Sequence, residues 1–260
     1  MGQAKGQVDF GRTAQDYGRH RCGFPNELGG ILERLGVAVK GRDALDLVTG
    51  TGSLARFFAR AGGRVTGLDP SEELMATARN IDRREGVEIT YVRGVAEDTG
   101  FADESFDIVS AGQCWHWFDG LRTAREVRRL LRSGGMAVIS HFDWIPLNSN
   151  IVTLTEEMIE KHNPAWKLGS GTGIYPPWLR HLGDAGFVNA RTASFDLDVE
   201  YTHEDWIGRI RASAGVGASL PDAAVRRFET EMRARLEEAF PEDPLSVLHR
   251  CWTVVASRPS

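Results

Sequence analysis

Residues 43–69 contain four residues whose types and spacing suit the binding of a nucleotide-like ligand. The segment reads DALDLVTGTGSLARFFARAGGRVTGLD and includes Asp46, Gly50, Gly52 and Asp69. Glycines in a turn let the backbone approach a ligand where a β-carbon would collide, and the helix that follows directs its positive N-terminal end toward the site. A carboxylate at the end of the second strand can accept hydrogen bonds from ribose hydroxyls. The segment therefore predicts a strand, turn, helix, strand unit that binds a cofactor.

The glycine spacing alone fits two kinds of cofactor. Gly50, Gly52 and Ala55 satisfy the GxGxxG/A rule for NAD or FAD. Asp46 stands four residues before Gly50, and dinucleotide-binding folds usually lack an acid there. The order Asp-Leu-Val-Thr-Gly-Thr-Gly resembles the first motif of class I S-adenosylmethionine-dependent methyltransferases, in which an acid ends the first strand and a DxGxGxG turn follows. Val48 departs from that motif because it occupies the place of the first glycine.

Four further segments follow the motif order of the same family. They are Asp69-Pro70-Ser71, Gly94-Val95-Ala96-Glu97, FDIVSAGQCWHWF at 106–118 and Leu131-Arg132-Ser133-Gly134-Gly135. The likeness is greatest to the small-molecule branch that includes trans-aconitate and many natural-product methyltransferases, in which HWF after the fourth strand is familiar. The segment FGRTAQDYGRHRCGFP at 10–25 resembles the entry helix of that branch, which folds over the cofactor.

The resemblance implies S-adenosyl-L-methionine as the cofactor and identifies the residues that bind it. These are Asp46, Thr49, Gly50, Gly52, Asp69, Pro70, Ala96, Glu97, Gln113 and Cys114, with Tyr17 and Arg21 in a lid. It also implies an α/β fold with a Rossmann-like, seven-stranded, mostly parallel sheet, helices on both faces, an antiparallel last strand and a helical cap. Arg21 is alternatively suited to pair with a carboxylate of the acceptor.

Hydrophobic patterns along the chain agree with that architecture. Strands are expected near 43–48, 64–69, 87–92, 106–111, 136–142, 188–199 and 251–257, and helices near 53–61, 71–82, 119–132, 203–213 and 221–240. The chain then divides into N-terminal lid and entry helices (1–42), a cofactor-binding core (43–142), a cap insertion lining the acceptor site (143–187) and a C-terminal part of the core with two inserted helices (188–260). The helix at 221–240 is amphipathic, and packing onto the domain or onto a second copy in a homodimer explains it equally well.

Composition narrows the class of protein. A chain of 260 residues can form one α/β domain with a cap. Its net charge of −5 argues against a broad phosphate-binding surface, so nucleic acid is not an expected partner. The three cysteines form no CxxC and have no histidine at zinc spacing, which predicts a reducing compartment and no metal. Neither a signal peptide nor a long apolar run is evident, so we expect a cytoplasmic protein without a membrane segment.

Three residues near the ends of the fourth and fifth strands are candidates for catalysis. A sulfonium methyl is already activated, so positioning supplies most of the reduction in barrier, and a base is needed only where the acceptor loses a proton. His116, between two tryptophans, is the best candidate base, although a packed core histidine is the alternative reading. His141 and Asp143 share the carboxyl edge of the sheet and could act together on a hydroxyl, or be turn and surface residues.

The expected reaction is methyl transfer from S-adenosylmethionine to a hydroxyl, carboxylate or activated carbon of a small organic acceptor by in-line displacement. Four tryptophans in or near the cap, Trp144, Trp166, Trp178 and Trp206, suit a wide mouth for an apolar or aromatic acceptor, and packing of the insertion explains them equally well. Two alternatives stay open. One is a methyltransferase-like protein that binds the cofactor without methyl transfer, as a cyclase or accessory subunit. The other is an NAD-linked oxidoreductase.

Overall fold

The computed structural model describes residues 19, 20 and 22–260, which form two compact units. The first, here called the core unit, comprises residues 23–142, 174–195 and 251–260. The second, called the helical unit, comprises residues 143–173 and 196–250 together with the described residues up to Cys22. The segment expected as a cap at 143–187 is therefore shared, since the chain returns to the core unit after Gly173.

The core unit alternates strands and helices as the hydrophobic patterns predict. In chain order it contains α2 (Glu27–Arg34), β1 (Asp43–Leu47), α3 (Ser53–Arg60), β2 (Arg64–Asp69), α4 (Glu72–Glu85), β3 (Thr90–Arg93), β4 (Phe106–Gly112), the short 3-10 helix η2 (Trp115–Trp117), α5 (Gly120–Leu130) and α7 (Pro176–Asp184). Three long strands, β5 (Leu131–Trp144), β6 (Val188–Tyr201) and β7 (Leu245–Ser257), contribute residues to both units.

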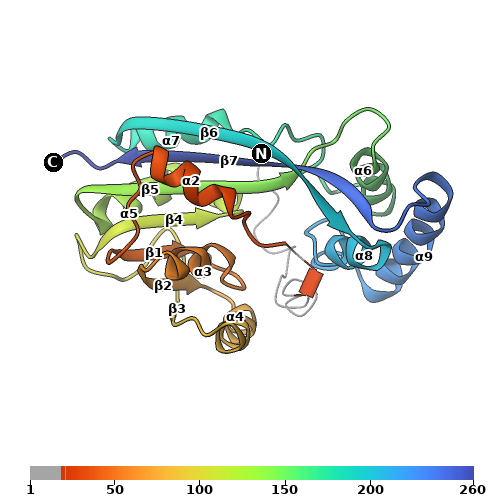
Figure 1. Ribbon diagram of the computed structural model, residues 1–260, viewed down its shortest axis with the longest axis horizontal. Helices are drawn as coiled ribbons and strands as arrows, with labels where there is room; N and C mark the ends of the chain where they lie inside the picture. The colour runs from red at the N-terminus through yellow and green to blue at the C-terminus, as the bar shows by residue number, and fades with distance from the viewer. Residues whose placement is uncertain (1–18, 21) are drawn as a thin grey trace. The chain divides into compact units, whose positions relative to one another are not determined.

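The strands form a seven-stranded sheet in the order β3-β2-β1-β4-β5-β7-β6. The β1 strand pairs in parallel with β2 and β4, β2 with β3, and β4 with β5, whereas the last strands are antiparallel. Helices α2 and α3 lie on the viewer's side of the sheet, with α5 and α7 behind it (Figure 1). Residues 44–47 of β1 are all buried, as expected for a parallel strand covered on both faces. The expected Rossmann-like sheet is thus confirmed.

The helical unit has its own apolar core. It contains α6 (Ile151–His162), α8 (His203–Arg211) and α9 (Asp222–Ala239). Trp206 is fully buried there, and its indole N–H donates to the Thr155 hydroxyl at 3.0 Å. The apolar stripe of α9, including Phe228 and Met232, packs into the same cluster, so this helix is accounted for within the unit. No helix in the described part of the chain is long and apolar enough to cross a membrane.

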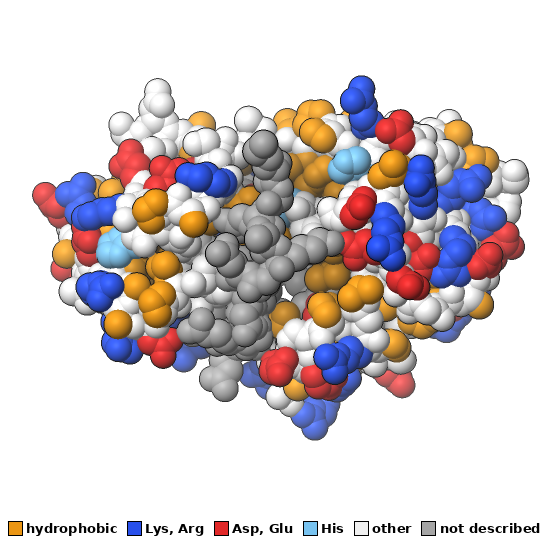
Figure 2. Space-filling model, turned by 180° about the vertical axis from the view of Figure 1, so that it is seen from behind, with side chains coloured by type: hydrophobic (Ala, Val, Ile, Leu, Met, Phe, Trp, Pro, Cys, Tyr) orange, Lys and Arg blue, Asp and Glu red, His pale blue; other side chains and the backbone are white. Residues whose placement is uncertain are grey.

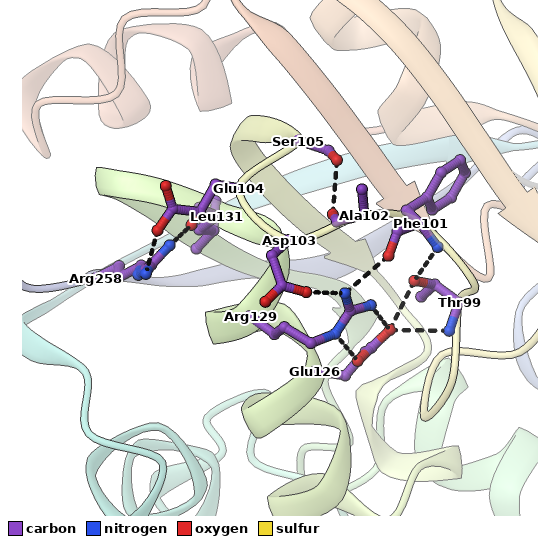
Figure 3. A network of polar contacts seen from close by, with 10 residues as sticks. All are labelled: Thr99, Phe101, Ala102, Asp103, Glu104, Ser105, Glu126, Arg129, Leu131 and Arg258. Atoms are coloured by element: carbon purple, nitrogen blue, oxygen red, sulfur yellow. Dashed lines mark hydrogen bonds and ion pairs between the residues drawn. The ribbon is translucent and has the colours of Figure 1, made fainter.

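A polar network ties the loop between β3 and β4 to helix α5. Arg129 donates to both carboxylate oxygens of Glu126 at 2.7 and 2.8 Å and to Asp103 at 2.6 Å (Figure 3). Thr99 donates to Glu126 through its backbone N–H at 2.9 Å and its hydroxyl at 2.7 Å. Burial raises the pKa of Glu126, but the hydrogen bonds from Arg129 and Thr99 outweigh it and hold that pKa at about 2.

The turn between β1 and α3 has a left-handed backbone at three positions. The φ angles are 47° at Val48, 58° at Gly50 and 82° at Gly52. A β-carbon at Gly52 would lie 2.5 Å from the hydroxyl oxygen of Tyr91 and 2.8 Å from Arg56 Nη1, so only glycine fits there. Val48 is a β-branched residue, and such a residue in this region is strained, which costs on the order of 1–3 kcal/mol.

Asp46 joins the end of β1 to this turn and to β4. The carboxylate is 1% exposed and accepts hydrogen bonds from the Thr49 hydroxyl at 2.6 Å and the Ser110 hydroxyl at 2.7 Å. Burial is the largest cause that raises the pKa of Asp46, the nearby charge of Asp69 adds to the rise and the two hydroxyl donors oppose it, so that the net pKa is about 6. Near neutral pH this carboxylate is therefore ionised at a cost in stability.

Replacing Val48 will show how much strain the turn holds. Both Val48→Gly and Val48→Ala remove the branched side chain, but only glycine relieves the left-handed backbone, which costs other residues roughly 1–2 kcal/mol. After allowance for the greater chain entropy of glycine when unfolded, we expect the glycine variant to be more stable than the alanine variant by about 1 kcal/mol. Urea unfolding measures the difference, and equal stabilities would refute the strain at this position.

The raised pKa of Asp46 predicts a pH dependence of stability. A carboxyl with a higher pKa in the folded chain binds more protons when folded, so the free energy of unfolding falls as pH rises from about 4 to about 6 and stays lowered above that. The full contribution of Asp46 is at most about 3 kcal/mol. We therefore expect the stability of Asp46→Asn, relative to wild type, to rise between pH 4 and pH 7. Unfolding curves of the two proteins that stay parallel across this range would contradict the assignment.

Candidate functional site

The predicted cofactor residues gather where β1, β2 and β4 end. Asp69 is the last residue of β2, and Asp46 is followed by only one further residue of β1. Gln113 directly follows β4. Because the carboxyl ends of parallel strands meet at one edge of the sheet, this edge is where open α/β sheets bind ligands. The fold therefore brings together segments that lie up to 67 residues apart, as in the bond between Cys114 and Leu47.

Asp69 connects three segments of this edge. Its carboxylate is 1% exposed and accepts hydrogen bonds from the backbone N–H groups of Gly50 and Ser71, both at 2.8 Å. Burial raises the pKa of Asp69, and these two donors oppose the rise. The carboxylate thus ties the end of β2 to the glycine turn and to the start of α4. Each oxygen keeps capacity for another hydrogen bond, such as one from a ribose hydroxyl.

The glycine turn itself is open at Gly50. A β-carbon built at Gly50, which is half-buried, would meet no atom of the described residues within 4 Å, so these residues leave room beside its backbone. Thr49 is held in place by two bonds, one from its hydroxyl to Asp46 and one from its N–H to the Leu68 carbonyl at 3.0 Å. Pro70 follows Asp69 and is exposed. The turn therefore combines a fixed backbone with room beside it, which a bound nucleoside requires.

The other predicted cofactor residues have more varied surroundings. Cys114 is 5% exposed and its thiol lies 3.3 Å from the Leu47 carbonyl. Burial raises the pKa of this thiol well above its usual value, and the charges of Asp46 and Asp69 raise it further, so the thiol stays protonated. Gln113 has a φ of 63° and donates its N–H to the Ser140 carbonyl at 2.9 Å.

Ala96 and Glu97 lie in the loop after β3. Ala96 is 1% exposed and packs in the core cluster, whereas the Glu97 carboxylate accepts from the backbone N–H of Asp119 at 3.1 Å. That bond links the loop to the residue that caps α5. Tyr17 and Arg21, predicted to form a lid, lie outside the described residues.

A group of aromatic rings, here called the aromatic cluster, surrounds two of the predicted catalytic residues. Its members are His116, His141, Tyr175, Trp178 and Trp252. The rings of His116 and His141 are 5.5 Å apart, and His141 lies 4.6 Å from Tyr175, which stacks on Trp178 at 4.2 Å. His141 is buried, whereas His116 is half-buried and also lies 4.7 Å from the Trp117 ring. The cluster thus gives two imidazoles an apolar setting.

Asp143, the third predicted catalytic residue, is assigned to the helical unit. Its carboxylate accepts the N–H of Trp144 at 3.0 Å and lies 4.0 Å from Arg209. Alternate side chains of a strand project to the same face, so Asp143 shares its face of β5 with His141. Joint action of these two residues on a hydroxyl stays a prediction.

Of the four tryptophans expected around an acceptor mouth, three pack in the helical unit. Trp144, Trp166 and Trp206 are 8%, 4% and 0% exposed, respectively, within its apolar core. Only Trp178 lies in the core unit, as part of the aromatic cluster. Packing of the helical unit therefore accounts for the burial of three of the four tryptophans. Only Trp178 of these four belongs to the aromatic cluster.

Several residues at this edge of the sheet were not predicted from the sequence. The buried Asp82 carboxylate accepts from Arg56 at 2.9 Å and from Tyr91 at 2.8 Å, and Tyr91 fills the space beneath Gly52. Their spacing carries no local pattern, because the bonds form only in the folded chain.

Among the described residues, no three His, Cys, Asp or Glu side chains are grouped so that they could hold a metal ion. On the face shown in Figure 2, Lys and Arg side chains lie among Asp and Glu.

Comparison with known proteins identifies the fold and the motifs. Residues 45–139 match the family described as a methyltransferase domain. An uncharacterized methyltransferase of Mycobacterium bovis is 33% identical over 128 residues, which are 49% of each chain. The malonyl-[acyl-carrier protein] O-methyltransferase of Pectobacterium atrosepticum is 30% identical over 66% of this chain and 62% of its own. The chain thus spans about half to two thirds of the length of these relatives.

The fold also matches solved structures. That of Haemonchus contortus phosphoethanolamine N-methyltransferase 2, in complex with S-adenosyl-L-methionine, superposes with a TM-score of 0.55 at 19% identity. The match covers 96% of this chain and 57% of that one. The family match agrees with the resemblance found in the sequence: residues 45–139 of this chain carry a methyltransferase domain.

Proposed function

We propose that this chain transfers the methyl group of S-adenosylmethionine to a small organic acceptor by in-line displacement. The observation that carries the proposal is the 2.8 Å hydrogen bond between the Gly50 N–H and Asp69, within a domain of the methyltransferase family. That bond sets the acid of the second strand beside the glycine turn of the first. The acceptor group we propose is a hydroxyl, a carboxylate or an activated carbon. The name of the Pectobacterium relative, an O-methyltransferase, supports an oxygen acceptor.

The residues present fit the proposed cofactor. Asp69 would accept ribose hydroxyls, Gly50 and Gly52 would let the backbone approach the ligand, and Glu97 and Ala96 would border the adenine. Gln113 and Cys114 would face the methionine part, where the neutral thiol of Cys114 adds no charge. S-adenosylmethionine supplies an activated methyl group on a sulfonium. The chain's task is then to orient the acceptor, keep water away and take up a proton where the acceptor releases one.

His116 is the side chain that we propose as the proton acceptor at the site. It is half-buried, so its imidazole is reachable, and its ring lies among aromatic neighbours that exclude water. His141 contacts it at a ring distance of 5.5 Å and would hold its orientation. A carboxylate acceptor would need no base, and for such an acceptor His116 would act through positioning alone.

Replacing Asp69 tests the cofactor site. Because a hydrogen bond to a buried charged group is worth about 1–3 kcal/mol, we expect Asp69→Ala to weaken S-adenosylhomocysteine binding roughly 5- to 150-fold in isothermal titration. Glu72→Gln, which changes an exposed carboxylate three residues away, serves as the control and should leave the affinity unchanged.

Two outcomes would count against this part of the proposal. Unchanged affinity in Asp69→Ala, with the fold intact by circular dichroism, would refute the ribose assignment. Tight binding of NADH by the wild-type chain, with no binding of S-adenosylhomocysteine, would instead favour the oxidoreductase alternative.

Replacing His116 tests the proposed base. For an acceptor that loses a proton, we expect His116→Ala to lower the turnover number by about 10²- to 10⁴-fold while the affinity for S-adenosylhomocysteine stays within twofold. Turnover is followed by mass spectrometry of deuteromethyl-labelled products formed from a cell extract. An unfolded His116→Ala variant would show that this histidine is a core residue, and bound cofactor with no labelled product from the wild type would favour the accessory-protein alternative.

A further inference from the structure

Helix α7 of the core unit carries a histidine, His181, that has no part in the proposed function. It follows Tyr175 and Trp178 along the chain at intervals of three residues. The rings of Tyr175 and Trp178 lie 4.6 and 5.7 Å from that of His141. The imidazole of His181 has a different partner, the indole of Trp115. Helix α7 and the residue before it therefore contact both segments that carry a predicted catalytic histidine.

The bond between Trp115 and His181 has only one possible direction. Nε1 of the Trp115 indole donates to Nδ1 of His181 at 3.2 Å. An indole N–H can donate but cannot accept, so the bond requires the form of the imidazole whose Nδ1 carries no proton. Trp115 is 2% exposed, and a buried donor that is left without an acceptor destabilises the fold. His181 therefore satisfies the buried indole and joins α7 to η2.

Gly120, at the start of α5, leaves room for the imidazole of His181. A β-carbon at Gly120 would lie 2.1 Å from Nδ1 of His181 and 2.3 Å from its Cε1, so any other residue there would displace the ring. The preceding residue, Asp119, caps α5, and its N–H donates to the Glu97 carboxylate. The imidazole is thus held from two sides, by the Trp115 indole and by the backbone where α5 begins.

The 3-10 helix η2 is only three residues long, so its orientation depends on the contacts of its side chains. Two backbone bonds define it, from Trp117 to Cys114 at 2.9 Å and from Phe118 to Trp115 at 3.3 Å. Trp115 is buried, whereas His116 and Trp117 are half-buried. The Trp115 ring therefore anchors η2 in the core unit. Because His116 is the next residue, a displacement of the Trp115 ring also moves the His116 imidazole.

We infer that His181 is a positioning residue for methyl transfer; the inference rests on the proposed function. Through the Trp115 indole, Nδ1 of His181 holds η2 in the orientation in which His116 acts on the acceptor. Misplacing a reacting group by about 1 Å can cost on the order of 100-fold in rate. His181 acts through Trp115 and not on the reacting atoms, so its loss lowers turnover and leaves the cofactor site in place.

A role of His181 in packing alone predicts a different result. Packing depends on the volume of the side chain at position 181, whereas positioning depends on an acceptor atom at the place of Nδ1. Asparagine offers a carbonyl oxygen near that place but is smaller than histidine. Leucine fills much of the volume but has no acceptor. The substitutions His181→Asn and His181→Leu therefore separate the two roles.

The first test measures turnover of the full chain, with a cell extract and deuteromethyl-labelled cofactor, and S-adenosylhomocysteine affinity by isothermal titration. We expect His181→Leu to lower turnover roughly 10- to 100-fold with the affinity within about threefold, and His181→Asn to recover most of the turnover. Trp115→Phe, which lacks the donor, should lower turnover as much, and adding His181→Leu to it should lower turnover by less than about twofold more. Arg180→Gln, on the exposed side of α7, is the control and should match the wild type.

The second test needs no acceptor. In the NMR spectrum of the full chain, the Trp115 indole N–H is identified by its absence from Trp115→Phe. We expect this N–H to exchange with deuterated solvent at least about tenfold faster in His181→Leu than in the wild type, and His181→Asn to keep it protected. Gly120→Ala, which displaces the imidazole while residue 181 stays a histidine, should also speed the exchange.

The outcomes separate this inference from the proposed function. Wild-type turnover in His181→Leu, a greater loss in His181→Asn than in His181→Leu, or additive losses in the double variant would overturn the inference. So would unchanged exchange of the indole N–H in both His181→Leu and Gly120→Ala. No labelled product from the wild type would instead count against the proposed function. If His181→Leu fails to fold, His181→Asn, Trp115→Phe and Gly120→Ala still decide.

Discussion

The candidate site depends on two buried carboxylates that hold a single turn of backbone. Asp69 accepts the N–H of Gly50, and Asp46 accepts the hydroxyl of Thr49 one residue earlier. Both acids are 1% exposed, and burial raises both pKa values. Together with the bond from the Thr49 N–H to the Leu68 carbonyl, these bonds hold the strained Val48 in its left-handed conformation beside the ends of β1 and β2. The turn is therefore rigid before any ligand arrives, which lowers the entropic cost of binding.

The candidate site has two different environments, one polar and one aromatic. Around the turn, polar groups are buried and mutually hydrogen-bonded, so backbone geometry is fixed. Around His116 and His141, aromatic rings predominate. This contrast suits a reaction in which a polar nucleoside must be held in one orientation while the reacting end is shielded from water.

Local patterns predicted much of the fold. The strand expected at 43–48 is Asp43–Leu47, and the helix expected at 119–132 is Gly120–Leu130, because apolar periodicity and capping residues act over a few positions. The strand expected at 136–142 extends from Leu131 to Trp144, and at its start Leu131 pairs with Phe106 of β4 although it lies outside the apolar run. The aromatic cluster and the bond between Trp115 and His181 could not be predicted, because each joins residues from elements far apart in the chain.

Tyr91 has a further consequence for how this sequence can change. Its hydroxyl occupies the volume that any side chain at position 52 would need, and that hydroxyl is also bonded to Asp82, the partner of Arg56. Position 52 is therefore not free to vary while these three side chains remain. During divergence, a larger residue at 52 becomes acceptable only together with a smaller one at 91. Gly52 of the motif and Tyr91, which lies far from it in the sequence, are therefore expected to change together.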